Sequence, residues 1–428
     1  MSSFAARVLD RLRRSSNPIA KYLYKYFRVN GPYLTDQLRK RNIPGAVESI
    51  RASNAKVLHL VPANLNLPEL KYHGSTKDIR GRTEYFVARA LSADEFCLHR
   101  EDRVASESMG LFHDEVRDLR KYEVIIVDIP GTFPKLIATL KRLAPNARVL
   151  FRAHNAEYFH RMDYFRAETA SSRRLKYLFA AIRGLIGDLR MVHSADAILS
   201  ISTWDTENYW RKLAALSGQK SKIIDVPYFL PDSLLPTRKP GAKENICVCL
   251  GVPHKPSPLI RDSLTRFVES VEKLPSDVRA SWRFTATGHP VEYIGSSKAI
   301  EFLGFLETPF DALLGGRAMC LLSDLGRGFK TKILDAAVSD AFTIVPRELY
   351  GRLPVLAKPV CIELESVDSS GLEEALMAAS KEFPSTDVNR RFRDLAFSSL
   401  DSVFGAQVER TEIETKFHAS YSEGPAQF

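Results

Sequence analysis

The stretch SDLGRGFKTKILD, residues 323–335, decides the fold predicted for this chain. The apolar run 319–322 before it predicts a short buried strand, and the periodicity of residues 329–338 predicts a helix. Gly326 and Gly328 lie between the two elements. Because glycine has no Cβ, the backbone of such a turn can approach a bound group closely. The stretch therefore predicts a strand, a glycine turn and a helix that form a ligand site.

The charged residues of this stretch favour a nucleotide diphosphate as the ligand. Lys330 and Lys332 lie near the start of the predicted helix, where free N–H groups and the helix dipole attract an anion. Asp335 follows about two turns past Gly328, where a carboxylate can accept hydrogen bonds from sugar hydroxyls. The alternative is a solvated, lysine-rich helix start. The spacing fits neither the P-loop nor the dinucleotide fingerprint, since the Gly-Lys-Ser/Thr and the third glycine are missing.

The length of 428 residues predicts two domains of about 150–230 residues each. Hydrophobic residues at 45% and charged residues at 26% are typical of a folded globular protein. No apolar run approaches the roughly 18 residues that span a bilayer, and the N-terminus lacks the apolar core of a secretory signal. Five scattered cysteines predict buried thiols in a reducing compartment, so a cytoplasmic location is expected.

The net charge of +10 predicts an anionic partner, which could be a nucleotide, a membrane surface or a nucleic acid. Residues 1–28 carry seven basic residues against one acid, and Phe4, Val8 and Leu12 fall at helical spacing. A basic amphipathic helix of this kind can lie on an anionic leaflet at the inner face of the cell membrane. The alternative for residues 1–28 is a loose tail or a helix packed on the protein.

Along the rest of the chain, strands and helices alternate, which predicts parallel sheets with helices on both faces. A polar loop is expected over 74–83 before a helix at 84–91, and a linker at 231–244 separates two such series. The fold class is therefore α/β, with two doubly wound Rossmann-like domains facing a cleft. The expected division is a basic segment 1–50, domains at 51–235 and 240–400, and a C-terminal helix and tail at 401–428. The predicted strands are 56–62, 95–100, 122–129, 147–153, 195–202, 222–227, 246–251, 282–288, 301–304, 319–322, 341–345 and 361–364.

Ligands of parallel sheets bind beyond the carboxyl ends of the strands. His154, Asn155 and Glu157 occupy such a position, directly after the predicted strand 147–153. The alternative is a helix start capped by Asn155. Further on, residues 171–193 predict a long helix with basic residues on an apolar body. That helix is either an ordinary amphipathic helix or a surface that faces a membrane or an acceptor.

Three segments together resemble those of GT-B glycosyltransferases. FRAHNAEYFHR, residues 151–161, resembles the His-Asn-x-Glu-Tyr segment after a strand in the N-terminal domain of the retaining enzymes. SADAILSIS, residues 194–202, resembles the segment that follows it. GRGFKTKILDAA, residues 326–337, resembles their C-terminal sugar-nucleotide segment, commonly a Gly-x-Gly-x-Lys-x-Lys run that ends in Glu-Ala. The likeness spans 56–350 and is to glycosyl transferases group 1, a family-4-like group of the GT-B fold.

The resemblance implies a role for each matching residue. It implies that the donor diphosphate is held by the glycine turn and lysines, namely Gly326, Gly328, Lys330, Lys332 and Lys255. Asp335 stands where the family has a glutamate that contacts the ribose. The family's earlier glutamate falls near Arg327, and the resemblance implies that Asp324 substitutes for it at the donor ribose or sugar. His154, with Asn155 and Glu157, is implied to be catalytic beside the transferred sugar. The glycine-rich acceptor loop of the family is only loosely matched by residues 74–82.

The expected reaction is transfer of a sugar, with retention, from a nucleotide-diphosphate sugar to a saccharide or lipid-linked saccharide acceptor, as in bacterial surface or exopolysaccharide synthesis. Lysines and a helix end would stabilise the leaving phosphate, so no metal or other cofactor is expected. One alternative is a non-catalytic sugar-nucleotide or polysaccharide-binding protein of GT-B fold, favoured by the aspartate at 335. A nucleic-acid partner is not expected, because the basic residues form no known RNA or DNA motif.

Overall fold

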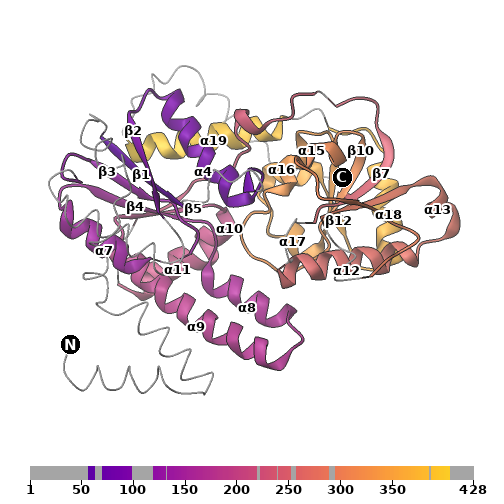
Figure 1. Ribbon diagram of the computed structural model, residues 1–428, viewed down its shortest axis with the longest axis horizontal. Helices are drawn as coiled ribbons and strands as arrows, with labels where there is room; N and C mark the ends of the chain where they lie inside the picture. The colour runs from indigo at the N-terminus through magenta and orange to yellow at the C-terminus, as the bar shows by residue number, and fades with distance from the viewer. Residues whose placement is uncertain are drawn as a thin grey trace, which may run out of the picture.

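The computed structural model describes residues 56–62, 70–98, 119–131, 133–218, 222–238, 240–251, 257–288, 295–384 and 387–404. These residues form two six-stranded sheets in which every neighbouring pair of strands is parallel (Figure 1). The predicted basic segment 1–50 and the predicted tail beyond residue 404 lie outside the described residues.

The sheet of the N-terminal half has the strand order β2-β1-β3-β4-β5-β6. Its strands are β1 (Val57–Pro62), β2 (Ala93–Leu98), β3 (Val124–Val127), β4 (Arg148–Ala153), β5 (Ala197–Ser200) and β6 (Lys222–Asp225). Its helices are α4 (Gly74–Ala88), α7 (Pro134–Leu143), α8 (Glu157–Ala167), α9 (Ser171–Ser194) and the run α10 (Thr203–Asp205), η4 (Thr206–Trp210) and α11 (Arg211–Leu216). The strand order changes direction between β1 and β3, and a ligand is expected beyond the carboxyl ends of these two strands.

The sheet of the C-terminal half has the order β12-β11-β10-β7-β8-β9, which changes direction between β10 and β7. Its strands are β7 (Glu244–Cys249), β8 (Arg283–Thr287), β9 (Glu301–Gly304), β10 (Gly316–Cys320), β11 (Phe342–Pro346) and β12 (Cys361–Leu364). The helices of this half are η5 (Asp232–Leu234), α12 (Pro258–Glu272), α13 (Ser276–Ser281), α15 (Phe310–Leu313), α16 (Lys332–Ala337), α17 (Arg347–Tyr350), η6 (Val355–Val360), α18 (Ser369–Ala379) and α19 (Val388–Phe404).

The structure confirms the predicted α/β class and the two doubly wound sheets. Every strand of both sheets overlaps a strand predicted from the sequence. The reason is burial on both faces: every residue of β1 and of β3 is buried. Strands of this kind are continuous apolar runs, which a sequence displays clearly.

The prediction of a polar loop over 74–83 is wrong, because these residues form most of helix α4. Two glycines caused the error. A Cβ on Gly74 would lie 3.0 Å from the Thr331 hydroxyl, and a Cβ on Gly81 would lie 3.1 Å from the Phe229 ring. Both glycines therefore allow close packing of a helix against distant segments and do not serve a turn.

The helix predicted over 329–338 is shorter than expected, because α16 begins only at Lys332. Phe329 packs between two aromatic rings instead, with ring centroids 5.9 Å from Tyr228 and 5.4 Å from Phe392. This packing holds residues 329–331 outside the helix. Helix α16 has only six residues. The sequence predicted that the start of this helix attracts an anion, but a helix this short contributes little to such attraction.

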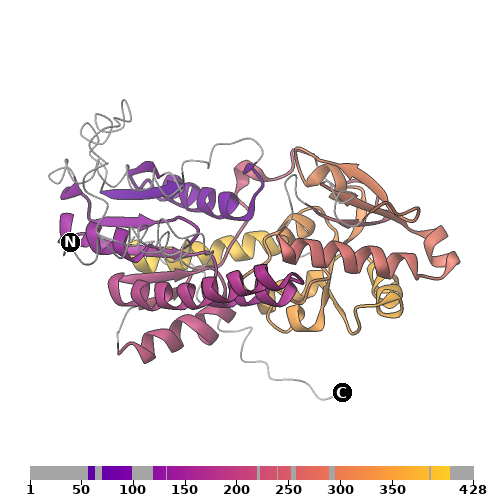
Figure 2. The ribbon, with the colours of Figure 1, turned by 60° about the horizontal axis from the view of Figure 1, so that its bottom comes forward.

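Helix α19 ties the two halves together, since it follows the second sheet in sequence but packs on the first (Figure 2). Asp401 accepts hydrogen bonds of 2.8 and 2.7 Å from the guanidinium of Arg89, the residue directly after α4. The side chain of Asn389 exchanges hydrogen bonds with both backbone groups of Leu230. One apolar core includes side chains of both sheets and of α19, so the halves are packed as one body. Among the residues that the structure describes, no helix is long and apolar enough to cross a membrane.

Candidate active site

A cavity of about 620 Å³ lies between the two halves. From the N-terminal half it is lined by the start of α4, by Pro130 after β3 and by α8 with the loop before it. From the C-terminal half it is lined by residues that follow β7, β8, β9 and β10. The walls are thus the carboxyl ends of parallel strands on both sides, which is where ligands of such sheets bind.

The residues singled out from the sequence fall into three groups around this cavity. Five of them line it, namely Asn155, Glu157, Lys330, Lys332 and Asp335. Four of them do not line it, namely His154, Gly326, Gly328 and Asp324. Lys255 lies outside the described residues. Asp324 instead forms an ion pair of 3.1 Å with Arg266 of α12.

The loop after β10 has the glycine turn that the sequence predicted. Gly326 and Gly328 have φ angles of 84° and 82°, in the left-handed region that side chains rarely adopt. A Cβ on Gly326 would collide with the ammonium of Lys330, and one on Gly328 would lie 3.3 Å from the amide oxygen of Asn155. The glycines thus let Lys330 fold back over the loop and let the N-terminal half approach it.

Two partly buried lysines, Lys330 of this loop and Lys332 at the start of α16, line the cavity. Burial, together with the smaller effect of the nearby Arg352, lowers the pKa of Lys330 to about 8, although Asp163 and Asp205 act in the opposite direction. Burial likewise lowers the pKa of Lys332, whose ammonium donates to the Leu250 carbonyl. Neither lysine forms an ion pair with any residue in the described part of the chain. An anion in the cavity would stabilise both ammonium groups.

Asp335 of α16 forms an ion pair with a lysine of the N-terminal half. Both of its carboxylate oxygens accept hydrogen bonds from the Lys77 ammonium of α4, at 2.8 and 2.6 Å. The two side chains are almost fully buried, at 1% and 2% exposure. This ion pair joins α4 to α16, and both of its residues line the cavity.

A second contact holds the glycine loop to the N-terminal half. Asp163 of α8 accepts a hydrogen bond of 2.9 Å from the backbone N–H of Gly326 and lies 3.6 Å from the Arg327 guanidinium. Arg327, at the position of the family's earlier glutamate, also lies over the rings of Phe159 and Trp204. The Arg327 guanidinium therefore contacts an anionic and aromatic surface of the other half.

His154 points away from the cavity into a buried cluster of charges, the "His154 cluster". Its Nε2 lies 2.8 Å from Asp128, which also interacts with Arg82 and, at 2.9 Å, with His59. Asp78 accepts hydrogen bonds of 2.9 and 2.7 Å from Arg152 and one of 2.9 Å from Arg82. Burial by itself raises the pKa of Asp78, but Arg152 and Arg82 outweigh it and hold that pKa well below its usual value.

The His154 cluster contains a set of groups that could bind a metal, since Asp78, Asp128 and His154 offer ligand atoms within 4.8 Å of one another. Both carboxylates, however, are already bonded by guanidinium groups. A divalent cation would have to displace Arg82 or Arg152, so the residues present do not fit a metal. The cluster instead fixes the ring of His154, which is next to Asn155 in the sequence.

Sequence reasoning missed several members of this region. Asp128 directly follows β3, but the predicted strand 122–129 contained it, so the strand-end rule that singled out His154 did not find it. Lys77 and Asp78 were not identified because residues 74–83 were wrongly predicted to form a loop. Asp163 and Asp205 carry no sequence signal, because only the tertiary fold brings α8 and α10 to the glycine loop.

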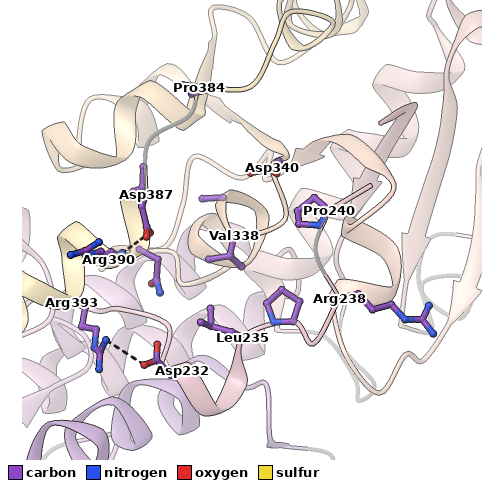
Figure 3. A pocket seen from close by; sticks show the side chains of 14 residues that line it. Asp232, Leu235, Arg238, Pro240, Val338, Asp340, Pro384, Asp387, Arg390 and Arg393 are labelled. Atoms are coloured by element: carbon purple, nitrogen blue, oxygen red, sulfur yellow. Dashed lines mark hydrogen bonds and ion pairs between the residues drawn. The ribbon is translucent and has the colours of Figure 1, made fainter. Parts of the chain in front are cut away.

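A second cavity, of about 530 Å³, lies between the segment after η5 and the start of α19 (Figure 3). Among its charged side chains, Arg393 lies 3.3 Å from Asp232, and Asp387 accepts a hydrogen bond of 2.9 Å from the backbone N–H of Arg390. It lies where the chain passes between the halves and is not at the strand ends. The cavity between the two sheets is therefore the candidate active site.

Comparison with solved structures identifies the fold as GT-B, the fold of a large class of glycosyltransferases. The sucrose-phosphate synthase of Thermosynechococcus elongatus is 12% identical, with 85% of this chain and 100% of that chain covered and a TM-score of 0.54. HepE of Anabaena, in complex with UDP, is 12% identical over 85% of this chain and 100% of that chain, with a TM-score of 0.46. A glycosyltransferase of Rickettsia africae is 11% identical over 87% and 100%, with a TM-score of 0.44. No protein-family model and no curated protein sequence matches the chain.

Proposed function

We propose that this protein is a retaining, metal-independent glycosyltransferase that uses a nucleotide-diphosphate sugar as donor. The observation that carries the proposal is that two partly buried lysines, Lys330 and Lys332, line the interdomain cavity and form no ion pair with a carboxylate of the described residues. Cleavage of a sugar–diphosphate bond builds negative charge on the leaving phosphate. Preorganised cations in a site shielded from water stabilise that charge strongly.

The roles of the other residues follow from their positions. Asn155 and Glu157 line the cavity opposite the lysines and are proposed to contact the transferred sugar. His154 is proposed to act through the loop that it supports, since its ring is held by Asp128. Retention would follow if the acceptor attacks from the face that the phosphate leaves, with phosphate oxygens taking the acceptor proton. Asp335 could accept hydrogen bonds from the ribose only when Lys77 shares or releases its carboxylate.

The acceptor is proposed to be a saccharide or a lipid-linked saccharide, in bacterial surface or exopolysaccharide synthesis. The support for a lipid-linked acceptor is the sequence of residues 1–28, whose seven basic residues and helical apolar spacing favour an anionic leaflet. The protein would then work at the inner face of the cell membrane.

A second candidate function is binding of a sugar nucleotide without turnover. Two observations favour it: Asp335 is fully engaged by Lys77, and arginine stands at 327 where the family has a glutamate. Both observations concern positions at which the family contacts the donor. Neither change removes the lysines that would bind the diphosphate.

Turnover separates the two candidates. Purified protein is incubated with nucleotide sugars, with and without EDTA, and the released nucleoside diphosphate is measured. We expect release from one donor, unaffected by EDTA, and a loss of about 100-fold in Lys332→Ala, because one stabilising group for developing charge has that effect. The exposed Lys298→Ala is the matched control and should be active. Nucleotide binding without release would favour the second candidate, and loss of release in EDTA would contradict metal independence.

A further inference from the structure

Asp205 is a buried carboxylate at the contact between the two halves. It belongs to α10, which follows β5, and only 1% of it is exposed. A Cβ on Gly328 would lie 3.6 Å from its Oδ2 atom, so the carboxylate lies close to the backbone of the glycine turn after β10. Neither of its carboxylate oxygens has a hydrogen-bond partner among the described residues. Since a buried polar group without a partner is costly, the position of Asp205 calls for an explanation.

The backbone of the N-terminal half fixes where this carboxylate lies. The Ser202 hydroxyl accepts a hydrogen bond of 3.1 Å from the backbone N–H of Asp205. The π-helix η4 begins at the next residue, Thr206, whose hydroxyl donates to the Ser202 carbonyl at 3.0 Å. Single turns of π-helix are rare and are frequent at functional sites. The side chain of Asp205 is therefore held at the interface by the local fold and not by a bond of its own.

Three cations of the C-terminal half face Asp205, namely Arg327, Lys330 and Arg352. Two of them are bonded elsewhere. Arg327 forms an ion pair of 3.6 Å with Asp163, and Arg352 donates a hydrogen bond of 2.9 Å to a backbone carbonyl of the loop after β10. Lys330 forms no ion pair within the described ranges, and of the three cations it lowers the pKa of Asp205 most. Lys330 is thus the cation on which an ionised Asp205 would act.

The converse holds for the carboxylates that face Lys330, which are Asp163 and Asp205. Asp163 is occupied, because it accepts a hydrogen bond of 2.9 Å from the Gly326 N–H and lies 3.4 Å from Arg166. Asp205 has no such partner. Lys330 also lines the interdomain cavity. The same ammonium is therefore within reach of the field of an unbonded carboxylate and of an anion bound in the cavity.

We propose that Asp205 is a positioning residue that controls how strongly Lys330 binds an anion in the cavity. An ionised Asp205 attracts the Lys330 ammonium and repels the anion, whereas a protonated Asp205 leaves the ammonium to the anion. That the anion is the diphosphate of the sugar donor rests on the proposed function. The action of Asp205 on Lys330 does not.

The direction of the pH dependence follows from the two groups. Burial raises the pKa of Asp205 to about 6, although the Ser202 hydroxyl and the charges of Lys330, Arg352 and Arg327 oppose this. Lys330, with a pKa of about 8, stays charged while Asp205 loses its proton. The site therefore binds an anion more tightly in mild acid than above neutral pH.

The rate at which acetic anhydride modifies Lys330, followed by mass spectrometry, tests the action of Asp205 without any ligand. Only the neutral amine reacts. Asp205→Asn removes the charge and keeps the shape of the side chain, and Asp205→Ala removes the charge in a second way. At about pH 7 we expect Lys330 to react about fivefold faster in both variants, because loss of a nearby anion lowers the pKa of an ammonium group by about 1.

Two controls accompany the labelling. The exposed Lys298 should react equally in all proteins, and the exposed Asp277→Asn should leave Lys330 as in the wild type. Equal rates at Lys330 in the wild type and in both Asp205 variants would overturn the proposal.

Binding of UDP-glucose, GDP-mannose and ADP-glucose by calorimetry, between about pH 5 and pH 7.5, tests the consequence for an anion. The phosphate groups of these nucleotide sugars do not titrate in this range. We expect the wild type to lose about tenfold in affinity as the pH rises and Asp205→Asn to keep the affinity that the wild type has at low pH. The same pH profile in both proteins would overturn the control of anion binding. A changed reactivity of Lys330 without binding of any nucleotide sugar would support the role of Asp205 and contradict the proposed function instead.

Discussion

Replacement of Lys77 by alanine is expected to destabilise the protein by about 3–5 kcal/mol, because it leaves the Asp335 carboxylate buried without its partner. Lys77 and Asp335 are 1% and 2% exposed and are joined by two hydrogen bonds. They also connect α4 to α16, so the loss weakens the contact between the two halves. The measurement is the free energy of unfolding from urea titration.

A double-mutant cycle isolates the pair from the rest of each side chain. The double variant Lys77→Met/Asp335→Leu should lower the free energy of unfolding by clearly less than Lys77→Met and Asp335→Leu do in sum. The reason is that the double variant removes both buried charges. The exposed pair Lys56–Glu123, 3.4 Å apart, is the matched control, and Lys56→Ala should cost about 1 kcal/mol or less. Additive single effects at 77 and 335 would contradict a buried interdomain ion pair.

Replacement of Asp205 by asparagine is expected to stabilise the protein at neutral pH by up to about 3 kcal/mol, and to have no such benefit in mild acid. Asp205 of α10 is 1% exposed, and its carboxylate lies beside the glycine loop. Burial raises its pKa to about 6, although the Ser202 hydroxyl and the charges of Lys330, Arg352 and Arg327 act in the opposite direction. The ionised carboxylate is thus a destabilising group that asparagine removes.

The sign of the pH dependence follows from this raised pKa. Between about pH 4 and pH 6 the folded protein holds a proton on Asp205 that the unfolded chain has lost, so stability falls as the pH rises. Unfolding midpoints of wild type and Asp205→Asn, measured across this range, should diverge as the pH increases. The exposed Asp277→Asn controls for the change from carboxylate to amide. A constant difference between wild type and variant at every pH would refute the assignment.

The sheets could be predicted from the sequence because the burial of each strand is visible in the strand's own residues. Strands buried on both faces, such as β1 and β3, are apolar runs that any pattern search detects. The strand-end rule pointed to Asn155 and Glu157, and the glycine and lysine pattern to Lys330 and Lys332, all of which line the cavity.

What the sequence did not reveal depends on contacts between distant segments. Gly81 looks like a turn residue, but it is required by the Phe229 ring that packs on α4. His154 looks like a cleft residue, but the carboxylates that hold its ring come from α4 and from the end of β3. In the sequence Asp335 looks available to a ligand, but in the fold both of its carboxylate oxygens accept hydrogen bonds from Lys77. Such pairings join residues up to 258 positions apart and leave no periodic signal.

The central claim is that the loop after β10 binds the diphosphate of a nucleotide, and nucleotide binding by thermal shift tests it most directly. Wild type, Lys330→Ala and the exposed control Lys298→Ala are heated with UDP, GDP, ADP or CMP, with and without EDTA. A ligand that binds only the folded state raises the unfolding midpoint. We predict a shift with one nucleotide that EDTA leaves unchanged, that Lys298→Ala retains and that Lys330→Ala loses. The absence of a shift with every nucleotide, or an equal shift in Lys330→Ala, would contradict the claim.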